Sequence, residues 1–298
     1  MSRTERLDFG GRVVLVTGAG RGIGRAYALW FAAHGASVVV NNRRHAGVPS
    51  AAEAVAAEIR ANGGSAIPDE HSIDTAEGNA AMVRTALDAF DRVDALVCNA
   101  SINPTVRLPV QEIPMEEARR MMDINFWGTF HGIRAALPAM LDAGYGRIVV
   151  TTSAAGLYGQ ANLSIYAASK MALIGLMRGV QCETRPADIR INAISPYART
   201  QMSEKAIPAD HAELMSPARI AWVVGYLCSE ACKRGGAILA AGAGRLRRTM
   251  IVEGAIVEPV DEDLTGLWPT LDDLHGVTEP RYVFDATKTM VPELMAPK

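Results

Sequence analysis

The sequence contains little that would mark a secreted, metal-binding or membrane-embedded protein. Four cysteines in 298 residues are too few for a disulfide framework, and the six histidines show no metal-ligand spacing such as H-x-x-x-H. No apolar run reaches the roughly 18 residues that a membrane span needs, and the charged start MSRTER is unlike a signal peptide. With 30 basic and 32 acidic residues the net charge is −2, so nothing draws the chain generally to nucleic acid or anionic membrane. We therefore expect a cytoplasmic protein without a metal, whose partner is neither nucleic acid nor membrane.

What the sequence does contain is a regular alternation of short β-type runs and amphipathic helical stretches. Hydrophobic residues make up 49% of the chain, enough for a substantial core. Continuous Val/Ile runs are typical of strands buried on both faces of a parallel sheet. The strand candidates are residues 12–18, 36–42, 93–100, 147–153 and 188–195. This order predicts a doubly wound, three-layered α/β fold with a parallel sheet of the Rossmann type.

The domain organisation is expected to be simple. No linker, repeat or low-complexity tract interrupts the chain before about residue 255. The following stretch, EPVDEDLTGLWPTLDDLHGVTEP, is acidic, proline-bearing and weakly periodic. We expect one catalytic domain over residues 1–254 and a C-terminal extension over 255–298, packed on that domain or on a partner subunit.

A glycine-rich turn, TGAGRGIG (17–24), follows the first strand and opens the first helix. The glycines Gly18, Gly22 and Gly24 have the spacing G-x-x-x-G-x-G. A turn of this kind lets the backbone approach a pyrophosphate and present N–H groups at a helix N-terminus. A merely flexible turn is the alternative, but its place in the first βα unit indicates dinucleotide binding.

The end of the second strand bears on the choice of cofactor. A carboxylate there would bind the adenosine ribose of NAD(H), whereas an arginine would accommodate the 2′-phosphate of NADP(H). The sequence has Asn42 followed by Arg43 and Arg44. These guanidinium groups favour NADP(H), and NAD(H) stays possible because both arginines could simply face solvent.

The stretch SIYAASK (164–170) places Tyr166 and Lys170 one helical turn apart on one face. A free phenol titrates near 10, and lowering its pKa toward 7 requires about 4 kcal/mol. A nearby ammonium and an oxidised nicotinamide ring would both stabilise the phenolate. Tyr166 would then transfer the proton, Lys170 would bind the nicotinamide ribose, and Ser153, at the end of a strand, would polarise the substrate oxygen. The Y-x-x-x-K pattern alone is weak, since many helices carry such pairs by chance.

Together these motifs resemble the short-chain dehydrogenase/reductase family from about residue 8 to 250. The resemblance is carried by TGAGRGIG (17–24), CNAS (98–101), Ser153 and YAASK (166–170). It implies Asn125 as a fourth catalytic residue, which would hold a water linking Lys170 to solvent. It also implies a set of cofactor contacts: Gly18, Arg21, Gly22, Ile23, Gly24, Asn42, Arg43, Asn99, Ala100, Tyr166, Lys170, Pro196 and Thr200.

The chain departs from the family pattern at three places. Ser101 stands where the family has a glycine, which should slightly change the approach to the nicotinamide ribose. Tyr197 replaces a second glycine, so Thr200 or Arg199 would contact the nicotinamide amide. The adenine contact is open between His71 and Asp74.

Other stretches resemble the dehydrogenase portion of peroxisomal-type multifunctional enzymes. These stretches are GRIVVTTSAAGLYGQ, SPYARTQM and LCSEACKRGGAILAAGAG. That branch implies a (3R)-hydroxyacyl-CoA or 17β-hydroxysteroid substrate, and it usually carries Asp at the position of Asn42 and prefers NAD(H). Residues 197–216 would form a lid, whose Met202, Ile207, Leu214 and Met215 either touch a lipid-like substrate or anchor the lid.

The sequence thus favours an oxidoreductase that interconverts a secondary alcohol and a ketone on a lipid-like substrate. A 3-oxoacyl carrier-protein reductase is the alternative within this class. A non-catalytic dinucleotide sensor and a scaffolding subunit are alternatives of other classes, the former disfavoured because all four catalytic residues are present. Apolar helices such as FWGTFHGIRAALPAM could pair across a two-fold axis, although the same residues could form intradomain core. The family resemblance implies a homodimer or homotetramer.

Overall fold

The computed structural model describes residues 7–200 and 209–251, and it confirms the doubly wound α/β fold. The strands are β1 (Val13–Val16), β2 (Ser37–Asn41), β3 (Ser65–Asp69), β4 (Ala95–Cys98), β5 (Tyr145–Thr151), β6 (Asp188–Tyr197), β7 (Ile238–Gly242) and β8 (Arg245–Thr249). The α-helices are α1 (Gly22–Ala33), α2 (Ala51–Ala61), α3 (Ala76–Phe90), α4 (Met115–Met122), α5 (Gly128–Asp142), α6 (Ala154–Tyr158), α7 (Ser164–Glu183) and α8 (Ala218–Cys228). Short 3₁₀ turns lie at Val110–Glu112 and Ala209–His211.

The eight strands form one sheet in the order β3-β2-β1-β4-β5-β6-β7-β8. The pairs from β3 through β7 are parallel, with Leu15 opposite both Val39 and Leu96 in the centre of the sheet. β8 follows β7 after two residues, Ala243 and Gly244, both with positive φ. Only a hairpin is compatible with so short a connection, so β8 closes this edge in the antiparallel sense.

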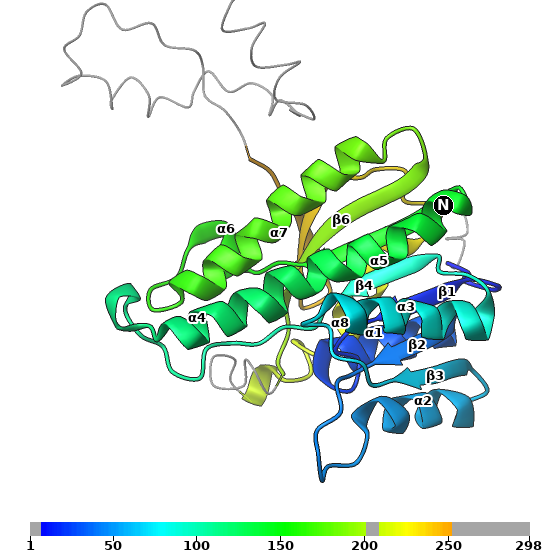
Figure 1. The fold of residues 1–298 in the computed structure, drawn as a ribbon, viewed down its shortest axis with the longest axis horizontal. Helices are drawn as coiled ribbons and strands as arrows, with labels where there is room; N and C mark the ends of the chain where they lie inside the picture. Colours follow the sequence, from blue (N-terminus) through cyan, green and yellow to red (C-terminus); the bar gives the residue numbers. More distant parts are fainter. Residues whose placement is uncertain (1–6, 201–208, 252–298) are drawn as a thin grey trace, which may run out of the picture. The chain divides into compact units, whose positions relative to one another are not determined.

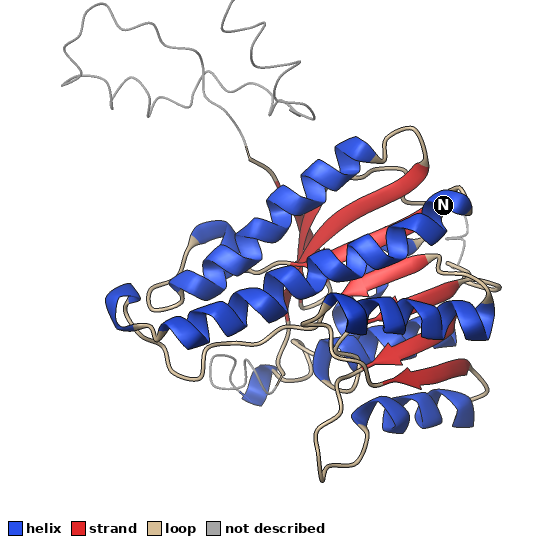
Figure 2. Ribbon diagram, viewed as in Figure 1, coloured by secondary structure: helices blue, strands red, loops and turns tan. Residues whose placement is uncertain are grey.

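Helices cover both faces of the sheet and complete the three layers (Figure 1, Figure 2). Side chains of α1, α2 and α8 form one core with one face of the strands, where Tyr27 and Phe31 of α1 are fully buried. Side chains of α3, α5 and α7 form the other core, where Met82, Met140 and Met177 are fully buried. Alternate strand residues face the two cores, which explains why the strands are apolar throughout.

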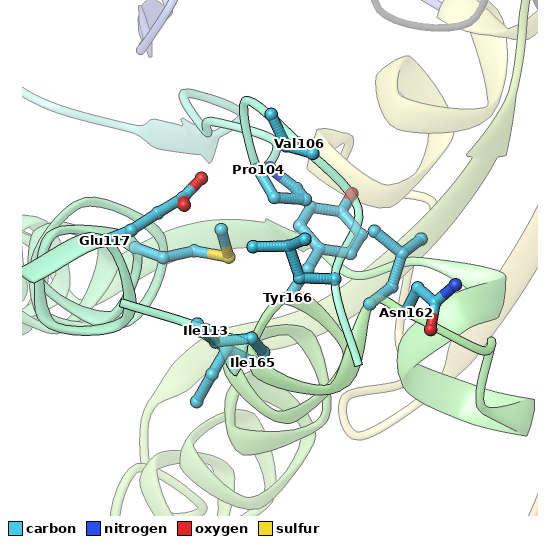
Figure 3. A pocket seen from close by; sticks show the side chains of 10 residues that line it. Pro104, Val106, Ile113, Glu117, Asn162, Ile165 and Tyr166 are labelled. Carbon is cyan, nitrogen blue, oxygen red and sulfur yellow. The ribbon is translucent and has the colours of Figure 1, made fainter. Parts of the chain in front are cut away.

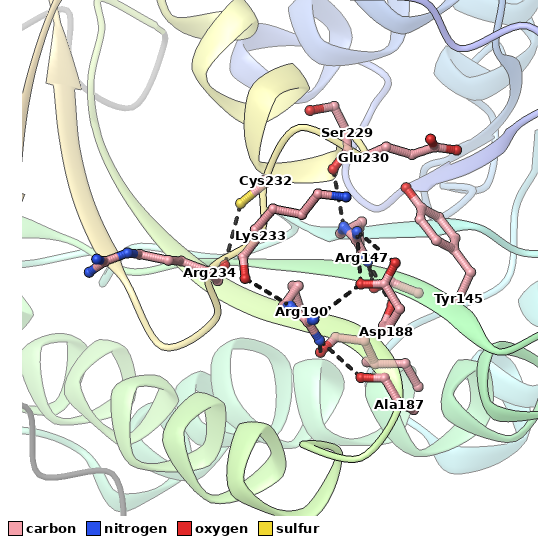
Figure 4. Close-up of polar contacts among 12 residues, drawn as sticks. Tyr145, Arg147, Ala187, Asp188, Arg190, Ser229, Glu230, Cys232, Lys233 and Arg234 are labelled. Carbon is pink, nitrogen blue, oxygen red and sulfur yellow. Dashed lines mark hydrogen bonds and ion pairs between the residues drawn. The ribbon is translucent and has the colours of Figure 1, made fainter.

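The amino ends of the strands carry a polar network rather than a ligand-binding surface. Arg147 of β5 is fully buried and donates from Nη1 to the carbonyl oxygens of Asp188 (2.7 Å) and Gly146 (2.9 Å), and from Nε to that of Ser229 (3.1 Å). Its guanidinium also forms an ion pair with the Asp188 carboxylate and lies 4.3 Å from the centre of the Tyr145 ring (Figure 4). This network fixes the ends of β5 and β6 on the side of the sheet away from the proposed site.

Two of our expectations fall on residues that the structure does not describe. The proposed extension, 255–298, lies outside the described residues, and so do Met202 and Ile207 of the proposed lid. The boundary at 254/255 stays a prediction. Among the described residues, no helix is both long enough and apolar enough to cross a membrane.

Candidate active site

The residues that the sequence singled out meet at the carboxyl edge of the sheet. The segments that follow β1, β4, β5 and β6 supply them, together with the start of α7 and the turn between α4 and α5. Ligands bind at this edge in doubly wound sheets, because helix N-termini and loops converge there.

The glycine turn after β1 is shaped by its lack of side chains. Gly18 has φ +64°, and a Cβ placed on it would lie 2.8 Å from the Cα of Ala100. A Cβ on Gly24 would lie 2.3 Å from the carbonyl oxygen of Gly18 and 2.5 Å from Nδ2 of Asn99. Helix α1 begins at Gly22, and its N-cap residue, Arg21, provides no side-chain cap. The turn therefore fits a pyrophosphate, since it presents uncapped N–H groups at a close backbone approach.

A hydroxyl on β1 joins this turn to the end of β4. The Thr17 Oγ1 accepts hydrogen bonds from the backbone N–H groups of Asn99 and Ala100, each at 3.0 Å. The Asn99 side chain returns the contact by donating from Nδ2 to the carbonyl oxygen of Thr17 (3.0 Å). Asn99 and Ala100 are thereby held against the glycine turn, where the resemblance expects them.

Carboxylates of the segment after β3 pair with both arginines at the end of β2. Arg43 lies 3.5 Å from the Asp74 carboxylate, and Arg44 lies 3.1 Å from that of Glu70. The arginines thus do not simply face solvent, although 39% of the Arg43 side chain and 68% of the Arg44 side chain are exposed. The sequence reasoning missed these pairs because it considered only the residues of the second strand.

The two candidates for the adenine contact both have partners of their own. Asp74 pairs with Arg43, and the His71 ring lies 2.8 Å from the carboxylate of Asp69. Asp69 is buried at the end of β3 and accepts a hydrogen bond from the side chain of Asn41 (2.6 Å). The buried carboxylate therefore fixes β2 to β3, and the adenine contact stays unassigned.

Asn125 lies in a π-helical turn, Asp123–Trp127, between α4 and α5. Its side chain is fully buried; Oδ1 accepts from the N–H of Ile102 (2.8 Å) and Nδ2 donates to the carbonyl oxygen of Ile102 (3.0 Å). Nδ2 also reaches the hydroxyl of Ser169 on α7 (3.2 Å). A π-turn disrupts regular helix geometry and is often found at functional sites. Nothing in the sequence indicated it.

The phenol of Tyr166 lies beside Ser153, as expected. Ser153 is the N-cap of α6, two residues after β5 ends, and its hydroxyl accepts a hydrogen bond from the N–H of Ala155 (3.2 Å). Burial raises the pKa of Tyr166 above its ordinary value, while hydrogen bonds with the hydroxyls of Ser153 and Ser101 lower it. The contact with Ser101 was not expected.

Lys170 lies one turn further along α7 and is only 2% exposed. Its Nζ donates to the carbonyl oxygen of Thr151 (2.9 Å) and lies 5.8 Å from the centre of the Tyr166 ring. Burial lowers the pKa of Lys170 to about 7. Among the protein's own groups, burial of Tyr166 dominates and raises its pKa, and the expected joint effect of the ammonium and a bound oxidised nicotinamide stays a prediction.

The end of β6 returns to the glycine turn. Pro196 and Tyr197 are the last residues of β6, and Thr200 follows them. A Cβ on Gly22 would lie 3.5 Å from Cγ2 of Thr200, so this side chain borders the turn. Arg199 instead has its backbone N–H bonded to the carbonyl oxygen of Met215 (2.7 Å). Of the two residues that the sequence left open, Thr200 is therefore the one whose side chain borders the glycine turn.

Two hollows open beside Tyr166 and share Pro104, Leu163 and Tyr166 as a common wall. One is a narrow, mainly apolar hollow with room for about one water molecule, lined also by Val106, Leu108, Ile113, Glu117, Met121, Asn162 and Ile165 (Figure 3). The other encloses about 500 Å³, part of it open to solvent, and is lined also by Asn103, Arg107, Ser153, Ala155 and Gln160. Sequence reasoning missed residues 103–121, because no motif marks the loop after β4 and helix α4, which line the hollows only after folding.

Comparison with known proteins agrees with this arrangement. Residues 12–210 match the family model described as short chain dehydrogenase. A short-chain type dehydrogenase/reductase of Mycobacterium tuberculosis is 37% identical over 274 residues, covering 89% of this chain and 95% of that protein. Peroxisomal multifunctional enzyme type 2 of Mus musculus is 37% identical over 300 residues, covering 96% of this chain and only 40% of that protein.

A solved structure shows the same fold with a ligand pair. It is a 7α-hydroxysteroid dehydrogenase complexed with NADH and 7-oxo glycochenodeoxycholic acid, with a TM-score of 0.73 and 30% sequence identity. The match covers 82% of this chain and 98% of that one. The protein therefore belongs to the short-chain dehydrogenase/reductase family and is an NAD(P)-dependent oxidoreductase of CH–OH groups.

Proposed function

We propose that Tyr166, Ser153, Lys170 and Asn125 interconvert a secondary alcohol and a ketone on a lipid-like substrate. The observation that carries this proposal is the phenol of Tyr166, hydrogen-bonded to Ser153 and facing both hollows at the carboxyl edge of the sheet. When bound, the nicotinamide cofactor donates or accepts the hydride. In the oxidative direction Tyr166 takes the alcohol proton, while Ser153 donates a hydrogen bond to the substrate oxygen and holds it in place.

Lys170 and Asn125 are proposed to support this proton transfer. The buried Lys170 would bind the nicotinamide ribose and pass protons between the ribose side of the site and solvent. Asn125, fixed by both polar atoms of its side chain, would hold a water on that route. A lysine whose pKa is about 7 can both release and accept a proton near neutrality, which suits it to this role.

The glycine turn and the residues around it would hold the cofactor. The N–H groups at the start of α1 would bind the pyrophosphate, and the contacts expected from Arg21, Ile23, Asn99, Ala100 and Thr200 lie in or beside that turn. Pro196, near the end of β6, would add a further contact. Between Thr200 and Arg199, the position of Thr200 against Gly22 favours Thr200 for the nicotinamide amide.

NADP(H) is the favoured cofactor. Arg43 and Arg44 follow β2, and the Asn42 side chain lies over the glycine turn, where a Cβ on Gly20 would be 2.8 Å from its Cγ. The ion pairs with Asp74 and Glu70 leave both guanidinium groups partly exposed, so a 2′-phosphate could replace either carboxylate. NAD(H) is the alternative, because Asn42 can accept a hydrogen bond from a ribose hydroxyl.

The shape and chemistry of the hollows favour an acyl thioester over a neutral steroid. The side chains that line the apolar hollow would contact an acyl chain and would have to move apart to admit it, since the hollow has room for about one water molecule. Arg107 is the one charged side chain among the described residues that line the polar hollow, beside Asn103 and Gln160. A hydroxyacyl thioester has an apolar chain on one side of its hydroxyl and a polar, anionic carrier on the other. The name of one relative fits this class, since it is a 3-oxoacyl-(acyl-carrier-protein) reductase of Synechocystis, 39% identical over 65% of this chain.

We propose a homodimer or homotetramer in the cytoplasm, built through the helices that follow β4 and β5 and through the last strand. An exposed aromatic side chain supports a subunit contact at these helices, since Trp127, just before α5, is 44% exposed. Sedimentation velocity of the purified protein tests the oligomeric state.

An absorbance assay tests the proposed reaction. Purified protein is given NADP⁺ or NAD⁺ together with a medium-chain (3R)-hydroxyacyl-CoA or a 17β-hydroxysteroid, and reduction of the nicotinamide is followed. We expect turnover of the thioester, faster with NADP⁺. Absence of turnover in all four combinations, with cofactor binding still measurable, would contradict the proposed substrate class.

A further inference from the structure

Ser101 lies in the catalytic site at a position fixed from both sides. The N–H of the residue before it, Ala100, donates to Oγ1 of Thr17 (3.0 Å). The residue after it, Ile102, exchanges two hydrogen bonds with the side chain of Asn125, at 2.8 and 3.0 Å. The backbone of Ser101 is therefore clamped between the first strand and the π-turn of Asn125.

The register of the sheet places Ser101 beside Ser153. Cys98 at the end of β4 pairs with Val150 of β5, and the two serines each follow three residues later. They thus leave the same edge of the sheet from neighbouring strands, and the hydroxyls of both act on the phenol of Tyr166 as hydrogen-bond partners that lower its pKa. A glycine at position 101, as in the family pattern, would leave the phenol with one serine only.

We propose that Ser101 donates a hydrogen bond to the phenolate oxygen of Tyr166, and so releases the Ser153 hydroxyl to donate to the substrate. A hydroxyl has one proton to donate, and Ser153 already uses a lone pair to accept from Ala155. Without Ser101, Ser153 would have to serve both the phenolate and the substrate oxygen. The inference rests on the proposed function, and it assigns the phenolate to Ser101 and the substrate oxygen to Ser153.

The proton balance of this arrangement is simple. In alcohol oxidation the O–H bond of the substrate breaks, and its proton forms a new O–H bond on the phenolate of Tyr166. Ser101 keeps its own proton throughout. It donates a hydrogen bond to the phenolate before the transfer and lies beside the neutral phenol after it. Reduction of a ketone reverses this transfer.

Titration of the phenol itself tests the proposal without relying on turnover. Tyrosine labelled isotopically at Cζ is incorporated into the full chain, and the Tyr166 resonance is identified by its absence from Tyr166→Phe. We expect Ser101→Ala to raise the pH at which Tyr166 titrates by about one unit, because a donor to the phenolate is lost. Ser101→Gly should do the same, and Ser101→Thr, which keeps the hydroxyl, should titrate near the wild-type pH.

Activity provides the second readout. In Ser101→Ala, kcat/KM for alcohol oxidation at neutral pH should fall about tenfold and recover as the pH rises, since one pKa unit is one factor of ten in phenolate. Unchanged titration of Tyr166 in both Ser101→Ala and Ser101→Gly would overturn the proposal. A shifted titration in a protein that oxidises no alcohol would instead leave the contact standing and contradict the proposed function.

Discussion

The ammonium nitrogen of Lys170 donates to the carbonyl oxygen of Thr151, 2.9 Å away, from a position that is almost fully buried. Thr151 is the last residue of β5, so this bond ties α7 to the strand that leads into Ser153. Burial costs the charged form more than this bond returns, and the pKa of Lys170 falls to about 7. The charge of Lys170 is therefore a source of instability at low pH.

Replacing Lys170 should change how stability depends on pH. Between about pH 7 and 10.5 the unfolded chain holds the lysine proton and the folded chain does not, so this group makes the free energy of unfolding rise with pH. Below about pH 7 both states are protonated and the destabilisation is complete. We expect Lys170→Met to gain several kcal/mol over the wild type at about pH 6, and this gain to shrink toward about pH 10.

Urea unfolding across this pH range measures the effect. The exposed Lys233 gives a matched control, since Lys233→Met removes a lysine charge from the surface. A gain in Lys170→Met that did not change with pH would mean that better packing of the methionine side chain, rather than removal of the buried charge, sets the difference.

Replacing Arg43 and Arg44 with Ala should weaken NADPH binding selectively. A 2′-phosphate bound by these guanidinium groups makes charge-assisted hydrogen bonds, whose loss corresponds to about a 10- to 100-fold change in Kd. Calorimetric titration with NADPH and NADH measures both affinities. Arg60→Ala is the control, because Arg60 also pairs with a carboxylate, that of Glu53, but lies on α2. Equal weakening of both cofactors by the double variant would show that these arginines do not bind the 2′-phosphate.

The glycine turn should not tolerate a methyl group at position 24. In Gly24→Ala the new Cβ would meet the backbone oxygen of Gly18 and the side chain of Asn99, so the turn has to open. We expect a loss of about 1–3 kcal/mol of stability and a larger loss of cofactor affinity.

Gly175→Ala on α7 is the matched control, since nothing lies within 4 Å of its new Cβ. That variant should gain up to about 1 kcal/mol, because alanine favours a helix. Thermal unfolding and cofactor titration distinguish the two, and normal binding by Gly24→Ala would refute the tight turn.

The polar network at the opposite edge of the sheet should matter for stability and not for chemistry. Arg147→Met removes a buried guanidinium and leaves the carbonyl oxygens of Gly146, Asp188 and Ser229 without their donor. We expect a loss of about 3 kcal/mol in the free energy of unfolding with KM unchanged. Arg25→Met removes a half-exposed pair with Glu58 and should cost less than about 1 kcal/mol. A raised KM in Arg147→Met would show that the network reaches the site.

The sequence predicted the parts of this molecule that depend on local pattern. Val/Ile runs marked β1, β2, β4, β5 and β6, and the four-residue spacing placed Tyr166 and Lys170 on one helix, α7. β3 (Ser65–Asp69) was not found as a strand, because it is short and contains Pro68. It lies at the edge of the sheet, where a residue without an N–H is tolerated.

The parts that sequence reasoning missed depend on contacts between distant segments. The hydroxyl of Ser101 reaches Tyr166 only because β4 and β5 pair in one register, and Arg43 meets Asp74 only because β3 lies beside β2. The departure from glycine at position 101 was visible in the sequence. That Ser101 lies beside Tyr166 was not visible, since no spacing rule relates residue 101 to residue 166.

Tyr166→Phe tests the central claim, that the phenol transfers the proton, most directly. This variant keeps the ring that separates the two hollows and removes only the hydroxyl, so cofactor binding should stay nearly intact. We expect kcat to fall by at least about 10²-fold, the contribution of a positioned general acid or base, while Tyr226→Phe on α8 leaves it unchanged. Nicotinamide absorbance gives the turnover and calorimetry gives the cofactor affinity. Loss of turnover with retained affinity is the predicted result, and substantial turnover in Tyr166→Phe would contradict the account.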